Sequence, residues 1–385
     1  MTRFSYTGED ARAREYLLAE FAALGLDVTV DGAGNIRAVL AGADSSLAPV
    51  ATGSHIDTVP CGGRFDGVVG VAAGLEALRM IKEEGGNKRP VGLIVFAEEE
   101  GSGFGPSCLG SKLATGQMQV SELEALRTPE GRTALQVMKD FGLDVTQLPQ
   151  QQITKDSLHG WIELHVEQAT NLETNGYSTG IVTAIAGVRL LEIKLKGVSN
   201  HAGSTPMGMR ADALCAAAEI ALVVERVESD HLKNNAVATV GYIDVKPNSF
   251  NVIPGDVTMT VDLRHVEDAV MDKGIAIVEQ AARDIAEKRG LAVEMALMGK
   301  GPGTKMSRVV IAAIKAAARE LGRDAMEMSS GAVHDTALVS KVAPAGMIFI
   351  PSVGGISHSP DEDTHIDDIV AGTRLLHRSL RILAK

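Results

Sequence analysis

The stretch VATGSHIDTVPCGGRFDGVVGVAAGLEALRMIK, residues 50–82, contains the basic unit of the expected fold. Its first four residues form a short, largely apolar segment, as in a buried strand that runs into a loop. Residues 67–82 then show the apolar spacing of a helix. A strand, a loop and a helix in this order are typical of an α/β layer whose helices lie outside the sheet.

The same alternation continues on both sides of this stretch. Residues 11–24 have helical spacing and end at Gly25, a residue type that often terminates helices. Residues 91–97, VGLIVFA, form a continuous apolar run of the kind that is buried on both faces of a sheet. We therefore expect an α/β domain with a mixed sheet flanked by helices, formed by residues 1–186 and 299–385.

The segment between these two parts, residues 187–298, has a pattern of its own. It reads strand, helix, strand, strand, helix, strand, with the long helices in MRADALCAAAEIALVVERV and VEDAVMDKGIAIVEQAARDIAEKRG. This order is the signature of a ferredoxin-like βαββαβ domain, here inserted into the first domain. Two domains also suit a chain of 385 residues, which is longer than one hydrophobic core usually serves.

Composition and charge exclude several classes of function. The net charge of -12 gives no attraction for nucleic acid or for an anionic membrane, and 3% aromatic residues argue against base stacking. No apolar run is long enough to span a bilayer, and charges interrupt the N-terminus too often for a signal peptide. Cys61, Cys108 and Cys215 match neither a zinc ribbon nor a disulfide framework. We expect a soluble cytoplasmic protein without a nucleic-acid or membrane partner.

Residues that could bind a metal follow the first strand. His55 and Asp57 are two residues apart, so their side chains point the same way in an extended stretch. Asp57 could then accept the free N–H of His55 and leave the other ring nitrogen for a metal. Asp66 lies among three glycines, which allow a tight turn of the backbone. A lone H-x-D is usually an ordinary polar loop, and the glycine-flanked Asp66 is what favours a metal site.

Three consecutive carboxylates, Glu98, Glu99 and Glu100, follow the apolar run that ends at Ala97. Like charges repel one another unless water or a cation neutralises them. The carboxyl end of a sheet strand is the usual ligand site of an open α/β sheet, so a cation is the better explanation here. An isolated acidic triplet would more often be a charged loop without a function.

Two histidines complete the candidate set. His165 lies in the strand pattern WIELHVEQ, and His358 lies in the loop GGISHSPDEDTHI. Taken singly, His165 would be a satisfied core histidine and His358 an exposed loop residue. Together with the carboxylates they form a nitrogen and oxygen ligand set without cysteine, which suits zinc, manganese, cobalt or nickel.

These segments resemble the M20 metallopeptidase-like superfamily, in its hydantoinase/carbamoylase branch. That branch contains N-carbamoyl-L-amino-acid hydrolases, β-ureidopropionases and allantoate amidohydrolases. The matching motifs follow the family's order and span nearly the whole chain: GSHIDTVPCGGRFDG, FAEEEGSGFGPSCLGS, LHVEQ, NHAGSTPM, NVIPGDVTMTVDLRH, SGAVHDT and PSVGGISHSP. Each motif is weak alone, and the set is specific.

The resemblance implies a role for each matching residue. Glu99 would be the general base, and Glu98 would not bind metal. Two divalent ions per chain, zinc or alternatively manganese, cobalt or nickel, would be held by His55, Asp66 as the bridge, Glu100, His165 and His358. Contacts to the substrate would come from Gln168, His201, Asn251, Arg264 and Gly355. The inserted domain would act as a lid and form a homodimer, with some of its residues reaching the partner's active site.

The implied reaction is hydrolysis of a carbon–nitrogen bond in a linear amide or amidine, above all the carbamoyl group of an N-carbamoyl-L-amino acid or related ureido acid. A metal-bridging hydroxide, formed with Glu99 as the base, would attack the carbonyl carbon, and His201 would stabilise the oxyanion. One alternative is an N-acyl-amino-acid deacylase or dipeptidase of the same superfamily, which His165 and the NHAG motif disfavour. Another is an inactive metal-binding homologue, which the presence of Glu99 and all five ligands disfavours.

The chain departs from the family pattern at three places. Ala169-Thr170 stand where Gly-Pro is usual, Val333 replaces a glycine, and the helical stretch that usually precedes MTRF is missing, which implies a late start. None of these changes removes a ligand, so they bear on substrate preference. His334 is expected near the site without binding metal, and Cys61 is expected to be a loop thiol.

The three residues of the inserted segment also have ordinary structural interpretations. His201 could cap a turn, Asn251 could be a turn residue, and Arg264 could form an ion pair at a strand end.

Overall fold

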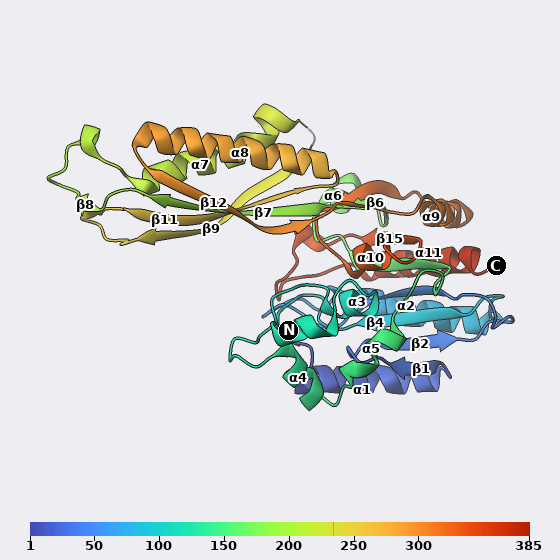
Figure 1. Cartoon of the computed structure of the whole chain (residues 1–385). Helices are drawn as coiled ribbons and strands as arrows, with labels where there is room; N and C mark the ends of the chain where they lie inside the picture. Colours follow the sequence, from blue (N-terminus) through green and yellow to red (C-terminus); the bar gives the residue numbers. More distant parts are fainter. Residues whose placement is uncertain (234) are drawn as a thin grey trace. The chain divides into compact units, whose positions relative to one another are not determined.

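The computed structural model describes residues 1–233 and 235–385 and divides into two compact units. The first unit comprises Met1–Thr183, Met306–Ser330 and His334–Lys385, and the second comprises Ala184–Lys305 and Gly331–Val333. Figure 1 shows the elements of each. Within these described residues, no helix is both long enough and apolar enough to cross a membrane.

The larger sheet has the strand order β1-β2-β4-β3-β5-β15-β6-β13, with β14 paired to β6. Strands β4, β3, β5 and β15 run parallel, whereas β1, β2 and β6 pair antiparallel, so the sheet is mixed as the sequence predicts. The strands are β1 (Asp27–Val30), β2 (Ile36–Leu40), β3 (Val50–His55), β4 (Val91–Phe96), β5 (Gly160–Val166), β6 (Gly180–Ile185), β13 (Thr304–Lys305), β14 (Met326–Ser330) and β15 (Ala345–Ile350).

Helices cover both faces of this sheet, and its central strands are buried along their whole length. Val50 and Val95 point into a core shared with α1, α2, α9 and α11, whereas Ala51 and Phe96 point into a second core beneath α3 and α10. The helices of this unit are α1 (Gly8–Ala23), α2 (Val68–Glu83), α3 (Leu109–Ala114), α4 (Ala134–Asp140), α5 (Leu148–Gln151), α6 (Asn171–Asn175), α9 (Arg308–Glu320), α10 (Asp335–Val339) and α11 (Ile366–Leu383).

The four central strands position the candidate site. Because they are parallel, their carboxyl ends meet at one edge of the sheet. His55 ends β3, the three glutamates follow β4, His165 lies at the end of β5, and the loop with His358 follows β15. Segments that are up to three hundred residues apart in the sequence therefore meet at this edge.

The second unit is built on an antiparallel sheet with the strand order β12-β7-β11-β9. Apolar side chains on one face of this sheet form a core with α7 and α8. Its elements are β7 (Gly187–Lys196), β8 (Asn200–His201), α7 (Ala213–Val227), β9 (Val237–Lys246), β10 (Val252–Ile253), β11 (Asp256–His265), α8 (Asp268–Arg289) and β12 (Ala292–Gly301).

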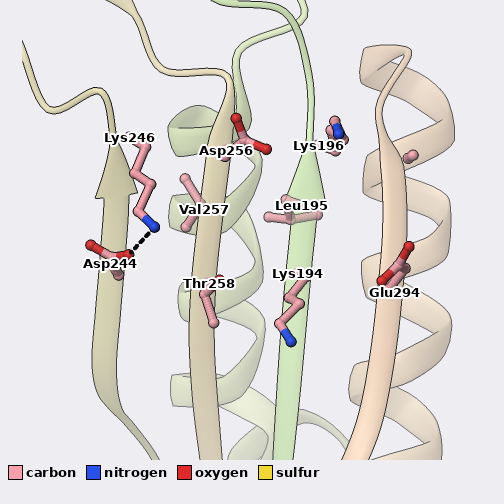
Figure 2. Close-up of a pocket in the computed structure, with 10 residues that line it drawn as sticks. Lys194, Leu195, Lys196, Asp244, Lys246, Asp256, Val257, Thr258 and Glu294 are labelled. Atoms are coloured by element: carbon pink, nitrogen blue, oxygen red, sulfur yellow. Dashed lines mark ion pairs between the residues drawn. The ribbon is translucent and has the colours of Figure 1, made fainter.

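The opposite face of the four-stranded sheet is polar around the end of β7. Along β7, Leu195 is buried against the helices, while its neighbours Lys194 and Lys196 are exposed on the other face. Figure 2 shows these side chains and, on the other side of β11, Lys246 and Asp244 of β9, which form an ion pair at 3.5 Å. This alternation is typical of an antiparallel sheet with one face in water.

Candidate metal centre

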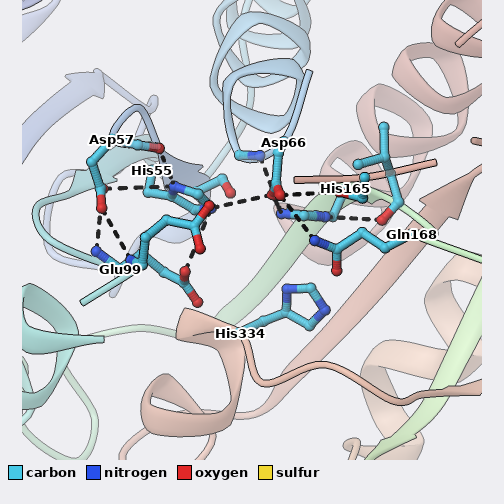
Figure 3. A network of polar contacts seen from close by, with 12 residues as sticks. His55, Asp57, Asp66, Glu99, His165, Gln168 and His334 are labelled. Atoms are coloured by element: carbon cyan, nitrogen blue, oxygen red, sulfur yellow. Dashed lines mark hydrogen bonds and ion pairs between the residues drawn. The ribbon is translucent and has the colours of Figure 1, made fainter. Parts of the chain in front are cut away.

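Asp66 lies at the centre of the candidate site (Figure 3). Its Oδ1 is 3.0 Å from Nε2 of His165 and 3.7 Å from Nε2 of His55. Its Oδ2 is 3.2 Å from Nε2 of His358. One buried carboxylate thus faces three imidazoles, two through one oxygen and one through the other.

Asp66 belongs to two groups of potential metal ligands. One group contains His55, Asp66 and His165, and the other contains Asp66, Glu100 and His358, with the ligand atoms of each group within 4.8 Å of one another. Nitrogen and carboxylate donors in these combinations suit a borderline divalent ion. The residues present therefore fit a pair of ions that share Asp66.

The electrostatics of the site also favour bound cations. Burial lowers the pKa of His55, but the carboxylates of Glu99, Asp57 and Asp66 outweigh it and raise this pKa well above its ordinary value. Burial raises the pKa of Glu99 well above its ordinary value, and Glu100 adds to this effect. So many carboxylates in a buried space repel one another, and divalent cations would neutralise them.

Hydrogen bonds at Nδ1 fix the orientation of two histidine rings. Nδ1 of His165 is 2.9 Å from the carbonyl oxygen of Val166, and Nδ1 of His55 is 3.1 Å from that of Asp57. A carbonyl can only accept, so both Nδ1 atoms carry the proton. The Nε2 atoms, which face Asp66, are therefore the nitrogens left to bind a metal.

Asp57 lies beside His55, but its carboxylate has a different partner from the one expected. The carboxylate is 3.6 Å from Nδ1 of His55, and the main-chain oxygen of Asp57 makes the shorter contact. The two carboxylate oxygens instead accept the backbone N–H groups of Glu99 at 3.2 Å and Glu100 at 3.0 Å. Asp57 thus fixes the backbone of the glutamates as well as neighbouring the ring.

The three consecutive glutamates point to different places. Glu98 adopts φ 54° and its carboxylate accepts the backbone N–H of Gly103, so this buried side chain belongs to neither ligand group around Asp66. Oε2 of Glu99 lies 3.8 Å from Nε2 of His55, and Oε2 of Glu100 lies 3.6 Å from Nε2 of His358. The left-handed conformation at Glu98 turns the chain between the strand and the site.

Two glycines shape the walls of the site. A Cβ atom at Gly67, which has φ +65°, would lie 2.4 Å from Nε2 of His55. Gly355, with φ +67°, approaches Ala169 and Thr170 so closely that a Cβ atom would lie 2.7 Å from Thr170 Cγ2. The second contact places Gly355 against the loop where the sequence departs from the family pattern.

Gln168 contacts the carboxylate of Asp66. Its Nε2 donates to Oδ2 of Asp66 at 2.9 Å and lies 3.5 Å from Nε2 of His358. Its Oε1 is buried and has no hydrogen-bond partner among the described residues. This side chain therefore offers a free acceptor beside the carboxylate that both ligand groups share.

Glu362 is a residue of the site that the sequence does not reveal. It is buried, and its Oε1 accepts the backbone N–H groups of Phe65 at 2.8 Å and Asp66 at 3.0 Å. Its Oε2 accepts the Ser357 hydroxyl at 2.9 Å. Glu362 thus ties the loop of Asp66 to the loop of His358, and the only signal in the sequence is an acidic run after that histidine.

His334 lies next to the site without joining either group around Asp66. Its ring centroid is 4.5 Å from that of His165, and its Nε2 is 3.0 Å from the Ser330 hydroxyl. Burial, with a further contribution from His165, holds the pKa of His334 well below its ordinary value. His334 also forms a third cluster with His165 and Glu163, but Glu163 already accepts the Ser54 hydroxyl and the Thr336 hydroxyl.

The other three predicted substrate residues belong to the second unit. His201 in β8 pairs with Val252 in β10, next to Asn251. Nδ1 of His201 accepts the backbone N–H groups of Gly203 at 3.0 Å and Ser204 at 3.2 Å. The exposed Nε2 of His201 is therefore left to act as the hydrogen-bond donor.

Arg264 forms the ion pair that was the alternative to substrate binding. Its Nε and a terminal nitrogen contact the two oxygens of Asp262 at 2.9 and 3.0 Å, and another nitrogen donates to the carbonyl of Gly331 at 3.1 Å. A guanidinium has five N–H groups, so these contacts leave others for an anion.

The two candidate substrate groups lie at opposite ends of β11. The two-stranded sheet of β8 and β10, with His201, joins the end at Asp256, which pairs with Lys196 of β7 (Figure 1). Arg264 lies eight residues along the strand, roughly 27 Å away at about 3.4 Å per residue. A small substrate cannot contact His201 and Arg264 of the same copy.

Comparison with known proteins agrees with the motifs. The sequence profile of peptidase family M20/M25/M40 matches residues 51–382. The chain is 37% identical over 384 residues to an N-carbamoyl-L-amino-acid amidohydrolase of Paenarthrobacter aurescens, covering 100% of this chain and 93% of that protein. It is 34% identical over 386 residues to an allantoate amidohydrolase of Escherichia coli K12, covering 100% and 93%. A crystal structure of an amidase of the hydantoinase/carbamoylase family from Burkholderia multivorans matches with a TM-score of 0.93 and 35% identity, covering 100% and 92%.

Proposed function

The chain belongs to peptidase family M20/M25/M40, and from that premise we propose that it removes the carbamoyl group of an N-carbamoyl-L-amino acid or a related ureido acid. It is a hydrolase of carbon–nitrogen bonds other than peptide bonds, as its amidohydrolase relatives are. The observation that carries the proposal is Asp66, whose two oxygens face the histidines of two separate ligand groups.

The five residues His55, Asp66, Glu100, His165 and His358 would hold two divalent ions, zinc or alternatively manganese, cobalt or nickel. When bound, such ions polarise a carbonyl group and lower the pKa of water.

Glu99 moves the proton in the proposed reaction. Its buried carboxylate, with Oε2 directed toward His55, takes a proton from the attacking water and returns it to the leaving nitrogen. The reaction consumes one water and releases the amino acid, ammonia and carbon dioxide. The neighbouring Glu98 takes no part, because its carboxylate is held by the backbone of Gly103.

Three further groups would bind the substrate. Oε1 of Gln168 is a buried free acceptor that suits an N–H group of a ureido substrate. The Nε2–H of His201 suits the oxygen that becomes negative in the transition state. The remaining N–H groups of Arg264 suit the carboxylate of the substrate.

A panel of substrates assayed for ammonia release tests this function. N-carbamoyl-α-amino acids, N-carbamoyl-β-alanine and allantoate should release ammonia, whereas N-acetyl and N-formyl amino acids and dipeptides should not be cleaved. Cleavage of the acyl compounds or dipeptides without ammonia release from any ureido compound would favour a deacylase or dipeptidase. Binding of metal with no turnover of any compound would favour a binding protein.

Arg264→Ala should raise KM for carboxylate substrates by about 10–100-fold and lower kcat much less. The reason is that the ion pair between Arg264 and the substrate carboxylate would be present in both the ground state and the transition state. Arg264→Lys is the matched control, since it keeps the charge and loses the planar fork that binds both carboxylate oxygens. Steady-state kinetics check this. An equal effect on a substrate that lacks the carboxylate would show that Arg264 has only the structural role of its pair with Asp262.

The separation of His201 from Arg264 leads to a prediction about assembly. We propose that the second unit forms a homodimer and that His201 and Asn251 serve the partner's site, because one copy cannot place them beside its own Arg264. Inactive Glu99→Gln and inactive His201→Ala chains should then complement each other. After equal mixing and verified subunit exchange, ammonia release should return to about a quarter of the wild-type value, since half the dimers are mixed and each has one intact site. No recovery would place His201 in its own chain's site or outside the reaction.

A further inference from the structure

The buried thiol of Cys108 contacts the carboxylate of Glu99. Its Sγ lies 3.3 Å from Oε1 of Glu99, and both side chains are shielded from solvent. Cys61 and Cys215 are exposed, so among the three cysteines Cys108 alone is buried. Cys108 immediately precedes α3, in a left-handed conformation with φ 57°.

The contact is a hydrogen bond that the thiol donates. Burial raises the pKa of Cys108 well above its ordinary value, and Glu99 and Asp335 add to this effect. The sulfur therefore keeps its proton at neutral pH. The geometry of the contact, from Sγ to Oε1 of Glu99, makes the S–H group the donor. In the ionised form in which a general base acts, the carboxylate of Glu99 can accept this bond.

Cys108 holds Glu99 at two points. Besides the thiol contact, the backbone N–H of Cys108 donates to the carbonyl oxygen of Glu99 at 2.6 Å. Asp57 holds the same residue from the other side by accepting its backbone N–H. With the backbone fixed, the thiol restricts the remaining freedom of the side chain, which includes rotation of the carboxylate.

The two oxygens of Glu99 consequently have different surroundings. Oε1 faces the thiol, and Oε2 faces Nε2 of His55 at 3.8 Å, on the side of the ligand group that contains Asp66 and His165. A carboxylate is planar, so a hydrogen bond to one oxygen also sets the direction of the other.

We propose that Cys108 is a positioning residue for the general base: its S–H group binds Oε1 of Glu99 and so directs Oε2 toward the attacking water. The hydrogen bond itself follows from the geometry, whereas its effect on turnover rests on the proposed function. The two parts are tested separately.

Infrared spectroscopy tests the hydrogen bond in the folded protein without any substrate. The S–H stretching band of Cys108 is identified as the difference between wild type and Cys108→Ala. Because a neutral amide accepts more weakly than a carboxylate, this band should shift to higher frequency in Glu99→Gln. An unchanged band in folded Glu99→Gln would overturn the proposal, whatever reaction the protein catalyses.

Kinetics of two substitutions test the positioning role. Cys108→Ala removes the donor and should lower kcat about tenfold with KM unchanged, the effect of one modest hydrogen bond. Cys108→Ser keeps a donor of similar size and should retain most of the activity. The matched control is Cys215→Ala, which removes an exposed thiol of the second unit and should change nothing.

The comparison of alanine with serine separates positioning from packing. Equal losses of kcat in Cys108→Ala and Cys108→Ser, in proteins with wild-type thermal stability, would show that the sulfur only fills space. An unchanged kcat in Cys108→Ala would also contradict the positioning role. Failure of the proposed function would look different, because wild type itself would then release no ammonia while the infrared band still reported on the hydrogen bond.

Discussion

Glu99→Gln is expected to keep its fold and its bound ions and to lose about 10²–10⁴-fold in kcat, the usual contribution of general acid–base catalysis. Glutamine matches glutamate in size but cannot take up the proton. Glu99 is also absent from both ligand groups that share Asp66, so its replacement removes no metal ligand. Rates of ammonia release, together with elemental analysis of the same preparation, check both parts.

The two neighbouring glutamates are the controls for this substitution. Glu100→Gln should lose metal, because Glu100 belongs to the group with Asp66 and His358. Glu98→Gln should have a much smaller effect, since its carboxylate contacts the backbone of Gly103 outside those groups. If Glu98→Gln were inactive and metal-replete, the base would be one residue earlier than we assign it.

Removal of metal is expected to abolish turnover completely. A chelator should inactivate the protein, and added zinc, manganese, cobalt or nickel should restore activity, because the ligand set of histidines and carboxylates suits these ions. Without them, Glu99 would have no activated water to deprotonate. Full activity in a preparation that elemental analysis shows to be free of metal would refute the mechanism.

Much of the fold could be predicted from the periodicity of the sequence. The apolar run 91–97 becomes the buried strand β4, and the helical spacing after Asp66 becomes α2. The meeting of His55 with the glutamates also follows from simple topology, because parallel neighbouring strands end at the same edge. An α/β layer with helices outside the sheet was therefore predictable without any relative.

The contacts between loops could not be predicted in this way. Glu362 binds the backbone N–H of Asp66 from 296 residues away, and no periodicity distinguishes it from the other acids near His358. Cys108 looked like one of three isolated thiols, and only its position before α3 brings it to Glu99. Such contacts depend on how irregular segments fold over the edge of the sheet, which local propensity does not encode.

The sequence correctly predicts that Asp57 lies beside His55, but it does not predict the hydrogen bonds of the Asp57 carboxylate. The spacing of two residues did bring it beside His55, with 3.6 Å between the carboxylate and Nδ1. The carboxylate oxygens instead accept the backbone N–H groups of Glu99 and Glu100. These N–H groups follow the end of a strand, where they need acceptors outside the sheet. The sequence pattern specifies the side of the chain on which a group lies, and competing donors decide its hydrogen bonds.

The central claim is that Asp66 is shared between two ion sites, and counting the ions tests it most directly. Elemental analysis of wild type after equilibration with zinc should give two ions per chain. His358→Ala removes a half-exposed ligand of one group only and should leave one ion per chain in a folded protein. A wild-type protein that binds no zinc, or a His358→Ala protein that still binds two ions, would contradict the account.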